Sequence, residues 1–164
     1  MATILTQTEA DNLFRLEKVP EDANNKYQFP ISGNRLIIPC LSKDKKENFH
    51  FDVSRGSIKL TKITYQNRAR KAYVLRRLDL DGAPHKNPEV ETVPFEVLSP
   101  YNGEDIPCPH LHIYVEGYGE KWAIPAVDVF NRIDDKEMYD IMFDFFTYCN
   151  LTGPPHILNS ITNL

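Results

Sequence analysis

Alternation of apolar and polar side chains constrains the fold of this chain most strongly. Phe49, Phe51 and Val53 alternate with polar residues, and residues 110–116 repeat the pattern. Successive side chains of a strand point to opposite faces of a sheet, so a period of two predicts strands that bury one face. Further candidate strands span residues 35–41, 58–65, 72–80 and 122–127. We expect a largely antiparallel sheet of five to six strands.

The sheet is expected to be curved and to be flanked by two helices. The parity of the apolar residues changes between Leu60 and Ile63, which indicates a β-bulge or a bend. Thr6 and Glu9 form a capping box before an N-terminal helix. A second helix is expected to begin after Asp134 and Asp135, where apolar residues recur at helical spacing. The predicted fold is a single α+β domain over residues 1–164.

The sequence gives no sign of export or of a membrane span. Cys40, Cys108 and Cys149 fit neither a zinc motif nor a disulfide framework. The first residues lack the pattern of a secretory leader, and the apolar runs are shorter than the ~20 residues of a spanning helix. We expect a cytoplasmic protein with reduced thiols and no membrane partner.

Basic residues are concentrated in one part of the chain. The net charge of −4 excludes a protein that coats nucleic acid by its overall charge. Residues 53–78, however, contain no acid and hold eight of the 19 basic residues. We expect a hairpin of basic strands that binds nucleic acid, RNA more than DNA, through its phosphates. The residues assigned to this surface are Arg55, Lys59, Lys62, Arg68, Arg70, Lys71 and Arg76.

Two other interpretations of the basic segment remain open. Its lysines could simply protect exposed strands from pairing with other chains. Its charge could also fit an acidic protein partner. Tyr65 and Tyr73 lie among the basic residues and favour the nucleic-acid interpretation, because aromatic rings stack on bases.

The segment at 110–116 contains the strongest candidates for catalysis. In a strand, His110, His112, Tyr114 and Glu116 would share one face at a spacing of about 6.6 Å. Two imidazoles can act as base and acid on the 2′-hydroxyl and the leaving oxygen of RNA, while an arginine holds the phosphate. The predicted catalytic residues are His110, His112, Tyr114 and Arg77, supported by Asp79, His85 and Glu116. This mechanism needs no metal and no cofactor.

Two alternatives to acid–base catalysis also remain open. An HxH pair with Asp79, Asp81 or His85 offers the imidazole and carboxylate ligands of a metal site. The histidines could also be polar residues without a function on the wet face of a sheet.

Two segments resemble an uncharacterised family of small bacterial and phage proteins. They are Pro84-His85-Lys86-Asn87-Pro88 and the run HLHIYVEGYGEKWA that begins at His110. The resemblance extends from the first predicted helix through the last and implies no particular activity. The order of strand, HxH segment and closing helix is similar, in architecture only, to ribonuclease-like toxins of toxin–antitoxin pairs, and it implies an antitoxin as a partner.

The resemblance to phage proteins implies an alternative function. Phage proteins of this size include non-catalytic inhibitors of host defence, among them anti-CRISPR-like proteins. Such a chain would bind a host defence protein complex and use acidic residues to mimic nucleic acid. The candidates are Asp134, Asp135, Glu137, Asp140 and Asp144.

Overall fold

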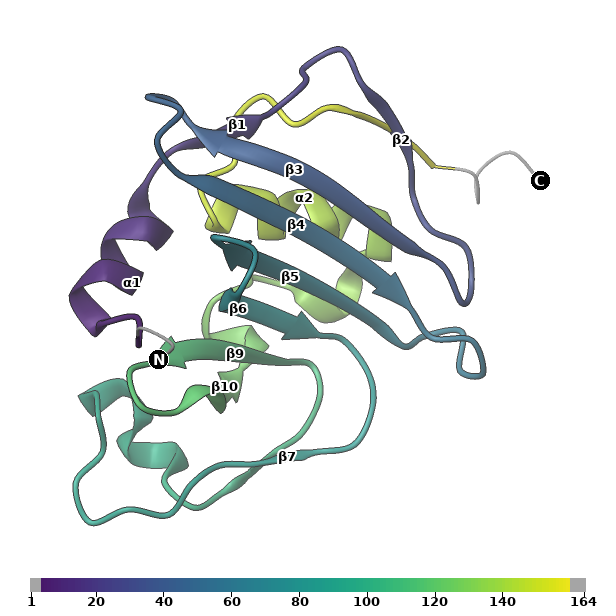
Figure 1. Ribbon diagram of the computed structural model, residues 1–164. Coiled ribbons are helices and arrows are strands. Elements are labelled where there is room, and N and C mark those ends of the chain that lie inside the picture. Colours follow the sequence, from purple (N-terminus) through teal and green to yellow (C-terminus); the bar gives the residue numbers. More distant parts are fainter. Residues whose placement is uncertain (1–3, 160–164) are drawn as a thin grey trace.

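A seven-stranded antiparallel sheet lies at the centre of the computed structural model, which describes residues 4–159 (Figure 1). The strands run in the order β1-β3-β4-β5-β6-β9-β10. Their bounds are β1 Lys18–Pro20, β3 Arg35–Ser42, β4 Asn48–Arg55, β5 Ile63–Ala69, β6 Tyr73–Asp79, β9 His110–Val115 and β10 Gly119–Pro125. The α+β class and the largely antiparallel sheet are confirmed, but the sheet has more strands than expected.

Short elements surround this sheet. Helix α1 spans Gln7–Arg15 and helix α2 spans Met138–Tyr148, and 3-10 helices cover η1 Glu96–Tyr101, η2 Ala126–Asp128 and η3 Ile133–Asp135. Two small pairs complete the fold. Strand β2 (Lys26–Gln28) pairs in parallel with β11 (His156–Leu158), and β7 (His85–Lys86) pairs with β8 (Asp105–Ile106).

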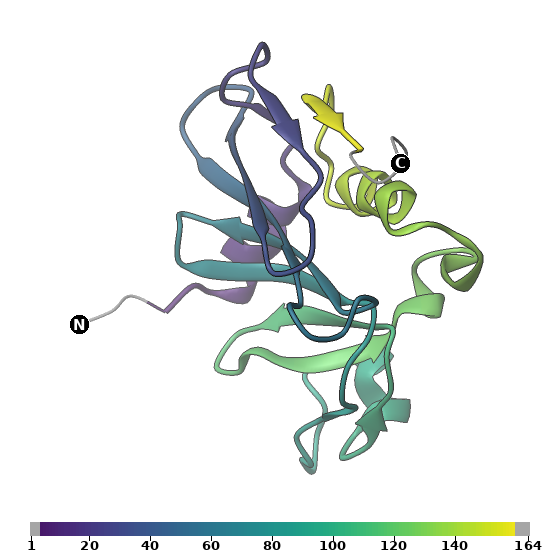
Figure 2. The same ribbon diagram turned by 90° about the vertical axis from the view of Figure 1, so that its right-hand side faces the viewer.

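Helix α2 covers one face of the sheet (Figure 2). Phe51 of β4 is fully buried, and its ring contacts Phe145 and Phe146 of α2 at centroid distances of 6.3 and 5.3 Å. Tyr65 of β5 is also fully buried, and its hydroxyl donates to the carbonyl of Met138. Each large apolar side chain buried here contributes about 1.5–3 kcal/mol. The opposite face, which we call the open face, therefore collects the polar residues of the same strands.

Two local predictions differ from the structure. Residues 58–60 are a loop and not part of a strand, and Ile58 is 98% exposed. A hydrogen bond from the amide of Gly56 to the carbonyl of Lys62 closes this loop. The change in the parity of the apolar residues therefore marks the point where the loop ends and β5 begins. The irregular register lies later, between Asn67 and Arg68.

The second helix begins later than expected. Asp134 and Asp135 belong to the separate turn η3, and α2 starts at Met138. The expected N-cap of the first helix is present, because the side chain of Thr6 accepts a hydrogen bond from the amide of Glu9. The carboxylate of Glu9 accepts from the hydroxyl of Thr6.

Buried Lys18 connects the two helices. Its Nζ donates to the carbonyls of Phe14, Leu16 and Cys149 at 2.7–2.9 Å, which are the chain segments at the ends of α1 and α2. Its side chain also lies over the ring of Phe49, at 4.9 Å from the centroid. The three carbonyls left over where the helices end are thereby satisfied.

The long segment between β6 and β9 passes along the outer side of β10. The side-chain amide of Asn87 donates to the carbonyl of Ala123 and accepts from its amide, both at 2.8 Å. Two residues earlier, His85 Nε2 donates to the carbonyl of Lys121 at 2.7 Å. His85 and Asn87 are two residues apart, and so are Lys121 and Ala123, so the two side chains contact β10 with the two-residue period of a strand.

None of the helices in residues 4–159 combines the length and the apolar character needed to cross a bilayer.

Candidate functional site

Strands β6 and β9 bring four of the predicted residues onto the open face. The register places Asp79 opposite His110, and Arg77 opposite His112. Residues opposite each other in an antiparallel pair point to the same face. Leu78 and Leu111, which lie between them, point to the α2 side and are fully buried.

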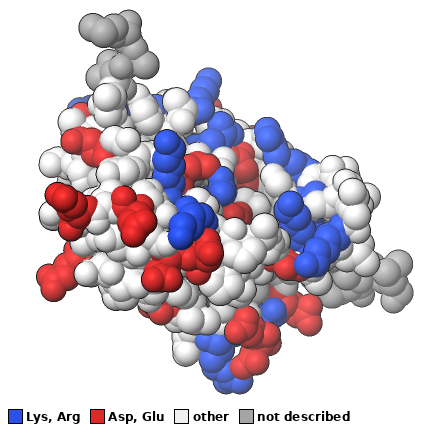
Figure 3. Space-filling model, turned by 90° about the horizontal axis from the view of Figure 1, so that it is seen from below, with Lys and Arg blue, Asp and Glu red and all other residues white. Residues whose placement is uncertain are grey.

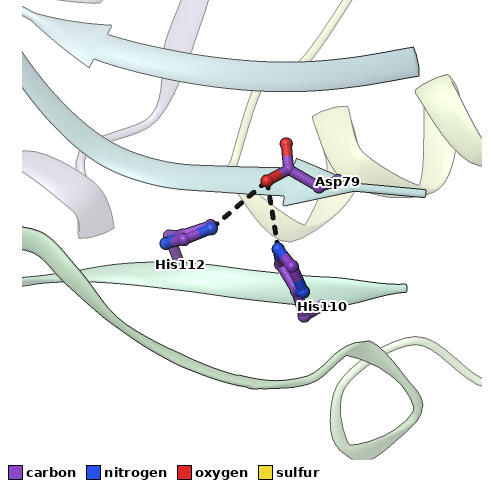
Figure 4. A group of neighbouring side chains, drawn as sticks. All are labelled: Asp79, His110 and His112. Carbon is purple, nitrogen blue, oxygen red and sulfur yellow. Dashed lines mark hydrogen bonds and ion pairs between the residues drawn. The ribbon is translucent and has the colours of Figure 1, made fainter. Parts of the chain in front are cut away.

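The two imidazoles converge on one oxygen of Asp79 (Figure 4). The Nε2 atoms of His110 and His112 lie 3.1 and 3.2 Å from Asp79 Oδ2. The other carboxylate oxygen, Oδ1, accepts a hydrogen bond from the hydroxyl of Thr64 at 2.9 Å. The side chains of His110 and His112 are only 3% and 1% exposed, against 17% for Asp79. These three residues are called the Asp–His cluster below.

Backbone carbonyls fix the orientation of both rings. Nδ1 of His110 lies 2.9 Å from the carbonyl of Ile106, and Nδ1 of His112 lies 2.8 Å from the carbonyl of Glu120. A carbonyl only accepts hydrogen bonds, so we assign a proton to each Nδ1. In the neutral rings, both Nε2 lone pairs then face Asp79.

Arg77 lies beside the cluster. Its Nη2 is 3.0 Å from His112 Nε2 and 3.4 Å from Asp79 Oδ2, and its Nη1 pairs with the carboxylate of Glu120. Its Nε is buried and has no partner among the described residues. Burial alone would raise the pKa of Asp79, but hydrogen bonds that the two histidines donate when their Nε2 atoms carry protons, together with the charge of Arg77, outweigh burial and lower it.

A polar pocket of about 440 Å³ opens next to the cluster. Its lining includes Arg77, Asp79 and His110 together with Lys62 from the loop before β5. The other lining residues are Ser54, Thr64, Gln66, Asp81, Gly82, Ala83 and Cys108. His112 is not among the residues that line the pocket. The ring of His85 packs against His112 at a centroid distance of 4.5 Å, and burial lowers the pKa of His85.

Comparison with known families adds a classification. A family model described as a family of unknown function, DUF6978, matches residues 5–151. The chain belongs to this family. The match agrees with the expected membership of an uncharacterised family, and it spans both strands of the Asp–His cluster. No curated protein and no solved structure matches this DUF6978 chain.

Tyr114 and Glu116 do not join the cluster in this DUF6978 protein. The hydroxyl of Tyr114 donates to the carbonyl of Leu5 at 2.6 Å, and the carboxylate of Glu116 accepts from the amide of Gln7 at 2.9 Å. Both therefore anchor the start of α1. The row of functional side chains predicted from the strand period ends at His112, because the N-terminal segment packs against the rest of β9.

The basic segment is not a continuous basic surface, in contrast to the expectation from sequence. Its cations pair with acids that lie elsewhere in the chain. Arg68 pairs with Asp52 at 2.6 Å, Arg70 with Glu47 at 2.8 Å, and Lys59 with Asp81 at 2.9 Å. On the face seen in Figure 3, acidic and basic side chains lie side by side. The pattern of charge along the sequence could not predict these ion pairs, because strand pairing and loop packing bring their members together.

Other members of the segment have structural contacts. Arg55 donates to the carbonyls of Pro30 and Leu60. Arg76 points to the α2 side, where its guanidinium lies 3.9 Å from the ring centroid of Phe14. Lys62 and Lys71 are exposed. Lys62 lines the pocket and Lys71 lies in the turn after β5.

The tyrosines of the segment do not form a stacking surface for bases. Tyr65 is fully buried under α2. Tyr73 is half-buried, and its ring makes an edge contact with Tyr114 at a centroid distance of 6.5 Å.

Sequence reasoning missed Thr64 and Glu120. Thr64 orients Asp79, while Glu120 pairs with Arg77 and provides the carbonyl that holds His112. Thr64 belongs to no motif, and Glu120 lies in the segment 110–123 that resembles the uncharacterised family without having been assigned a role there. The register of β5 on β6, and of β10 on β9, is the signal that identifies them.

Proposed function

We propose that this chain binds RNA at the open face of its sheet and cleaves a phosphodiester bond in the pocket beside the Asp–His cluster. One observation supports this function above all. The pocket is where the basic segment meets the histidine strand, since Lys62 and Arg77 line it together with Asp79 and His110. Cations and proton-transfer groups in one polar cavity are what phosphate-ester chemistry requires.

The size and the polarity of the pocket favour a nucleotide-sized group. Ligand pockets typically enclose about 300–1,000 Å³, and this one encloses about 440 Å³. The planar guanidinium of Arg77, which lines the pocket, suits a phosphate. Ser54, Thr64 and Gln66 add neutral polar groups for the sugar or the base.

The geometry modifies the mechanism expected from sequence. Metal-independent cleavage by two histidines needs imidazole nitrogens that face the substrate. Here the Nε2 atoms of His110 and His112 face Asp79, and each Nδ1 faces a backbone carbonyl. The arrangement favours a reaction centre in which Asp79, His110 and His112 act together.

The test is a cleavage assay on labelled single-stranded RNA, with DNA of the same sequence as comparison. Wild type and His110→Ala are assayed in buffers with and without divalent cations. His50→Ala is the matched control, because His50 lies on β4 outside the pocket lining. We expect cleavage of RNA by wild type and the control, and at least a 100-fold loss in His110→Ala. Intact RNA after incubation with folded wild type in every buffer would contradict the proposal.

The same experiment separates this function from the inhibitor of host defence. The acidic residues of η3 and α2 that would mimic nucleic acid are accompanied by cations, since Asp135 of η3 pairs with Arg132, and Asp144 of α2 pairs with Lys136. An enzyme is expected to cleave RNA in the cytoplasm and to cause a growth arrest that an antitoxin relieves. An inhibitor would bind a host protein complex and leave RNA intact.

A further inference from the structure

Three atoms of metal-ligand type converge at the floor of the open face. The Nε2 atoms of His110 and His112 and a carboxylate oxygen of Asp79 lie within 4.8 Å of one another. Figure 4 shows the two rings directed at the same carboxylate from the neighbouring strand. We propose that Asp79, His110 and His112 bind one divalent transition-metal ion. This site deepens the proposed function by naming its cofactor class, although ion binding is measurable without RNA.

The orientation of the rings is the first argument. A histidine that binds a metal through one nitrogen almost always donates the other N–H to a carbonyl or a carboxylate. Both rings do so here, His110 to the carbonyl of Ile106 and His112 to the carbonyl of Glu120. Arg77 Nη2 reaches the Nε2 of His112, but among the described residues no cation contacts the Nε2 of His110, which faces the carboxylate of Asp79 at 3.1 Å.

Electrostatics gives the second argument. The side chains of His110 and His112 are only 3% and 1% exposed, so little water reaches their nitrogens. A divalent ion would form coordinate bonds to both nitrogens and balance the charge of the carboxylate that they face. Near this position lie the carboxylates of Asp79 and Glu120 and the cation Arg77, which pairs with both of them.

The distances fit an ion of this class. Ligands about 2.0–2.1 Å from a tetrahedral ion lie roughly 3.3–3.4 Å apart. The observed separations between Asp79 Oδ2 and the two Nε2 atoms, 3.1 and 3.2 Å, are close to this spacing, and all three ligand atoms lie within 4.8 Å of one another. Thr64 occupies the other carboxylate oxygen and leaves Oδ2 for the ion. Arg77 has to give up its contact with His112 and keeps its pair with Glu120.

The donor set favours a transition metal over magnesium or calcium. Two imidazole nitrogens with one carboxylate suit zinc, iron or manganese, whereas magnesium and calcium prefer oxygen ligands only. Three protein ligands leave a coordination position, and Asp79 and His110 both border the pocket. An ion there would activate a water or bind a phosphate oxygen on the pocket side.

Titration of chelator-treated, dialysed full-length protein with Zn²⁺ and with Co²⁺ tests the site. Calorimetry gives stoichiometry and affinity, and the Co²⁺ absorption spectrum reports the ligands. We expect one ion per chain and no thiolate charge-transfer band. Asp79→Asn and His110→Gln, which keep the size of the side chain, should weaken binding at least about 100-fold while their thermal unfolding shows that they fold.

Cys108→Ser and His85→Gln are the matched controls. Neither residue belongs to the proposed ligand set. Cys108 Sγ lies 3.5 Å from Nδ1 and 4.0 Å from Nε2 of His110, and the ring of His85 lies 6.0 and 4.5 Å from the ring centroids of His110 and His112. Both should bind within about threefold of wild type. Equal affinity of wild type and Asp79→Asn, or no binding by folded wild type, overturns the site.

The outcomes separate this inference from the proposed function. Binding of one ion without RNA cleavage supports the metal site and overturns the nuclease. RNA cleavage by a chelated protein that binds no ion overturns the metal site and leaves the nuclease.

Discussion

Thr64 lies directly opposite Asp79 in the β5–β6 pairing, and its hydroxyl donates to Oδ1 of that carboxylate at 2.9 Å. One oxygen of Asp79 is therefore held by the neighbouring strand while the other faces the two histidines. A carboxylate held in this way keeps its orientation at little entropic cost when a ligand binds. Outer partners of metal ligands commonly change affinity 10- to 100-fold.

Thr64→Val removes this hydroxyl and keeps the shape of the side chain. We expect about 10-fold weaker Zn²⁺ binding, because Asp79 is then free to rotate. Thr64→Ser retains the hydroxyl and should bind close to wild type. Calorimetric titration measures both, and an unchanged affinity in Thr64→Val would show that the hydroxyl does not orient the carboxylate.

Lys62 is the exposed cation of the pocket, and its removal should weaken RNA binding. For Lys62→Ser we expect a several-fold loss of affinity and a salt slope smaller by about one, since one phosphate contact is lost. Lys46→Ser is the control, because Lys46 is exposed in the β3–β4 turn and does not line the pocket. Fluorescence anisotropy at several salt concentrations measures both. An equal loss in the two variants would contradict a role of this pocket.

Asn87→Ala should destabilise the fold. The substitution leaves the amide and the carbonyl of Ala123 without their side-chain partner. An unsatisfied buried polar group costs about 1–3 kcal/mol, so we expect the free energy of unfolding to fall by about 2–3 kcal/mol. Urea denaturation measures this loss, with the exposed Asn131→Ala as control. A loss no larger than that of the control would mean that water replaces the amide.

The stability of the protein should depend on the charge of Lys18 at alkaline pH. Burial lowers the pKa of Lys18 to about 8, from an ordinary value of 10.5. Between these values the unfolded chain holds the proton and the folded chain does not, so the contribution of Lys18 to stability rises with pH. Relative to Lys18→Met, wild type should gain about 1–2 kcal/mol between pH 7.5 and 9.5.

Urea unfolding of both proteins at the two pH values checks this prediction. The variant isolates Lys18, because the buried thiols of Cys40 and Cys149, whose pKa is raised to about 12, are present in both chains. A difference that stays flat or shrinks with pH would contradict the prediction. At pH 7.5, Lys18→Met should itself be less stable, since three carbonyls lose their donor.

The sequence predicted which faces of the strands are buried, but not which residues lie opposite each other. Phe49, Phe51 and Val53 are fully buried as the alternation indicates. The pairing of Asp79 with His110 depends on how β9 crosses to β6 after a connection of about 30 residues, and no local pattern encodes that register.

Charge and burial were harder to predict than strands. The basic segment looked unopposed because its partners Asp52, Glu47 and Asp81 lie outside it in sequence. One interpretation of the sequence placed His110 and His112 on a wet face, but both side chains are buried, and the connection between β6 and β9 holds His110 through the carbonyl of Ile106. Long loops with many prolines give little periodic signal, so their packing could not be anticipated.

The contacts of His85 and Asn87 with β10 have a consequence for self-association. A sheet with a free edge is a template on which another chain can add a strand. At one end of this sheet, β1 is only three residues long. At the other end, two side chains spaced like strand residues occupy the carbonyls of Lys121 and Ala123. The sheet is therefore closed to growth at β10 without an eighth strand.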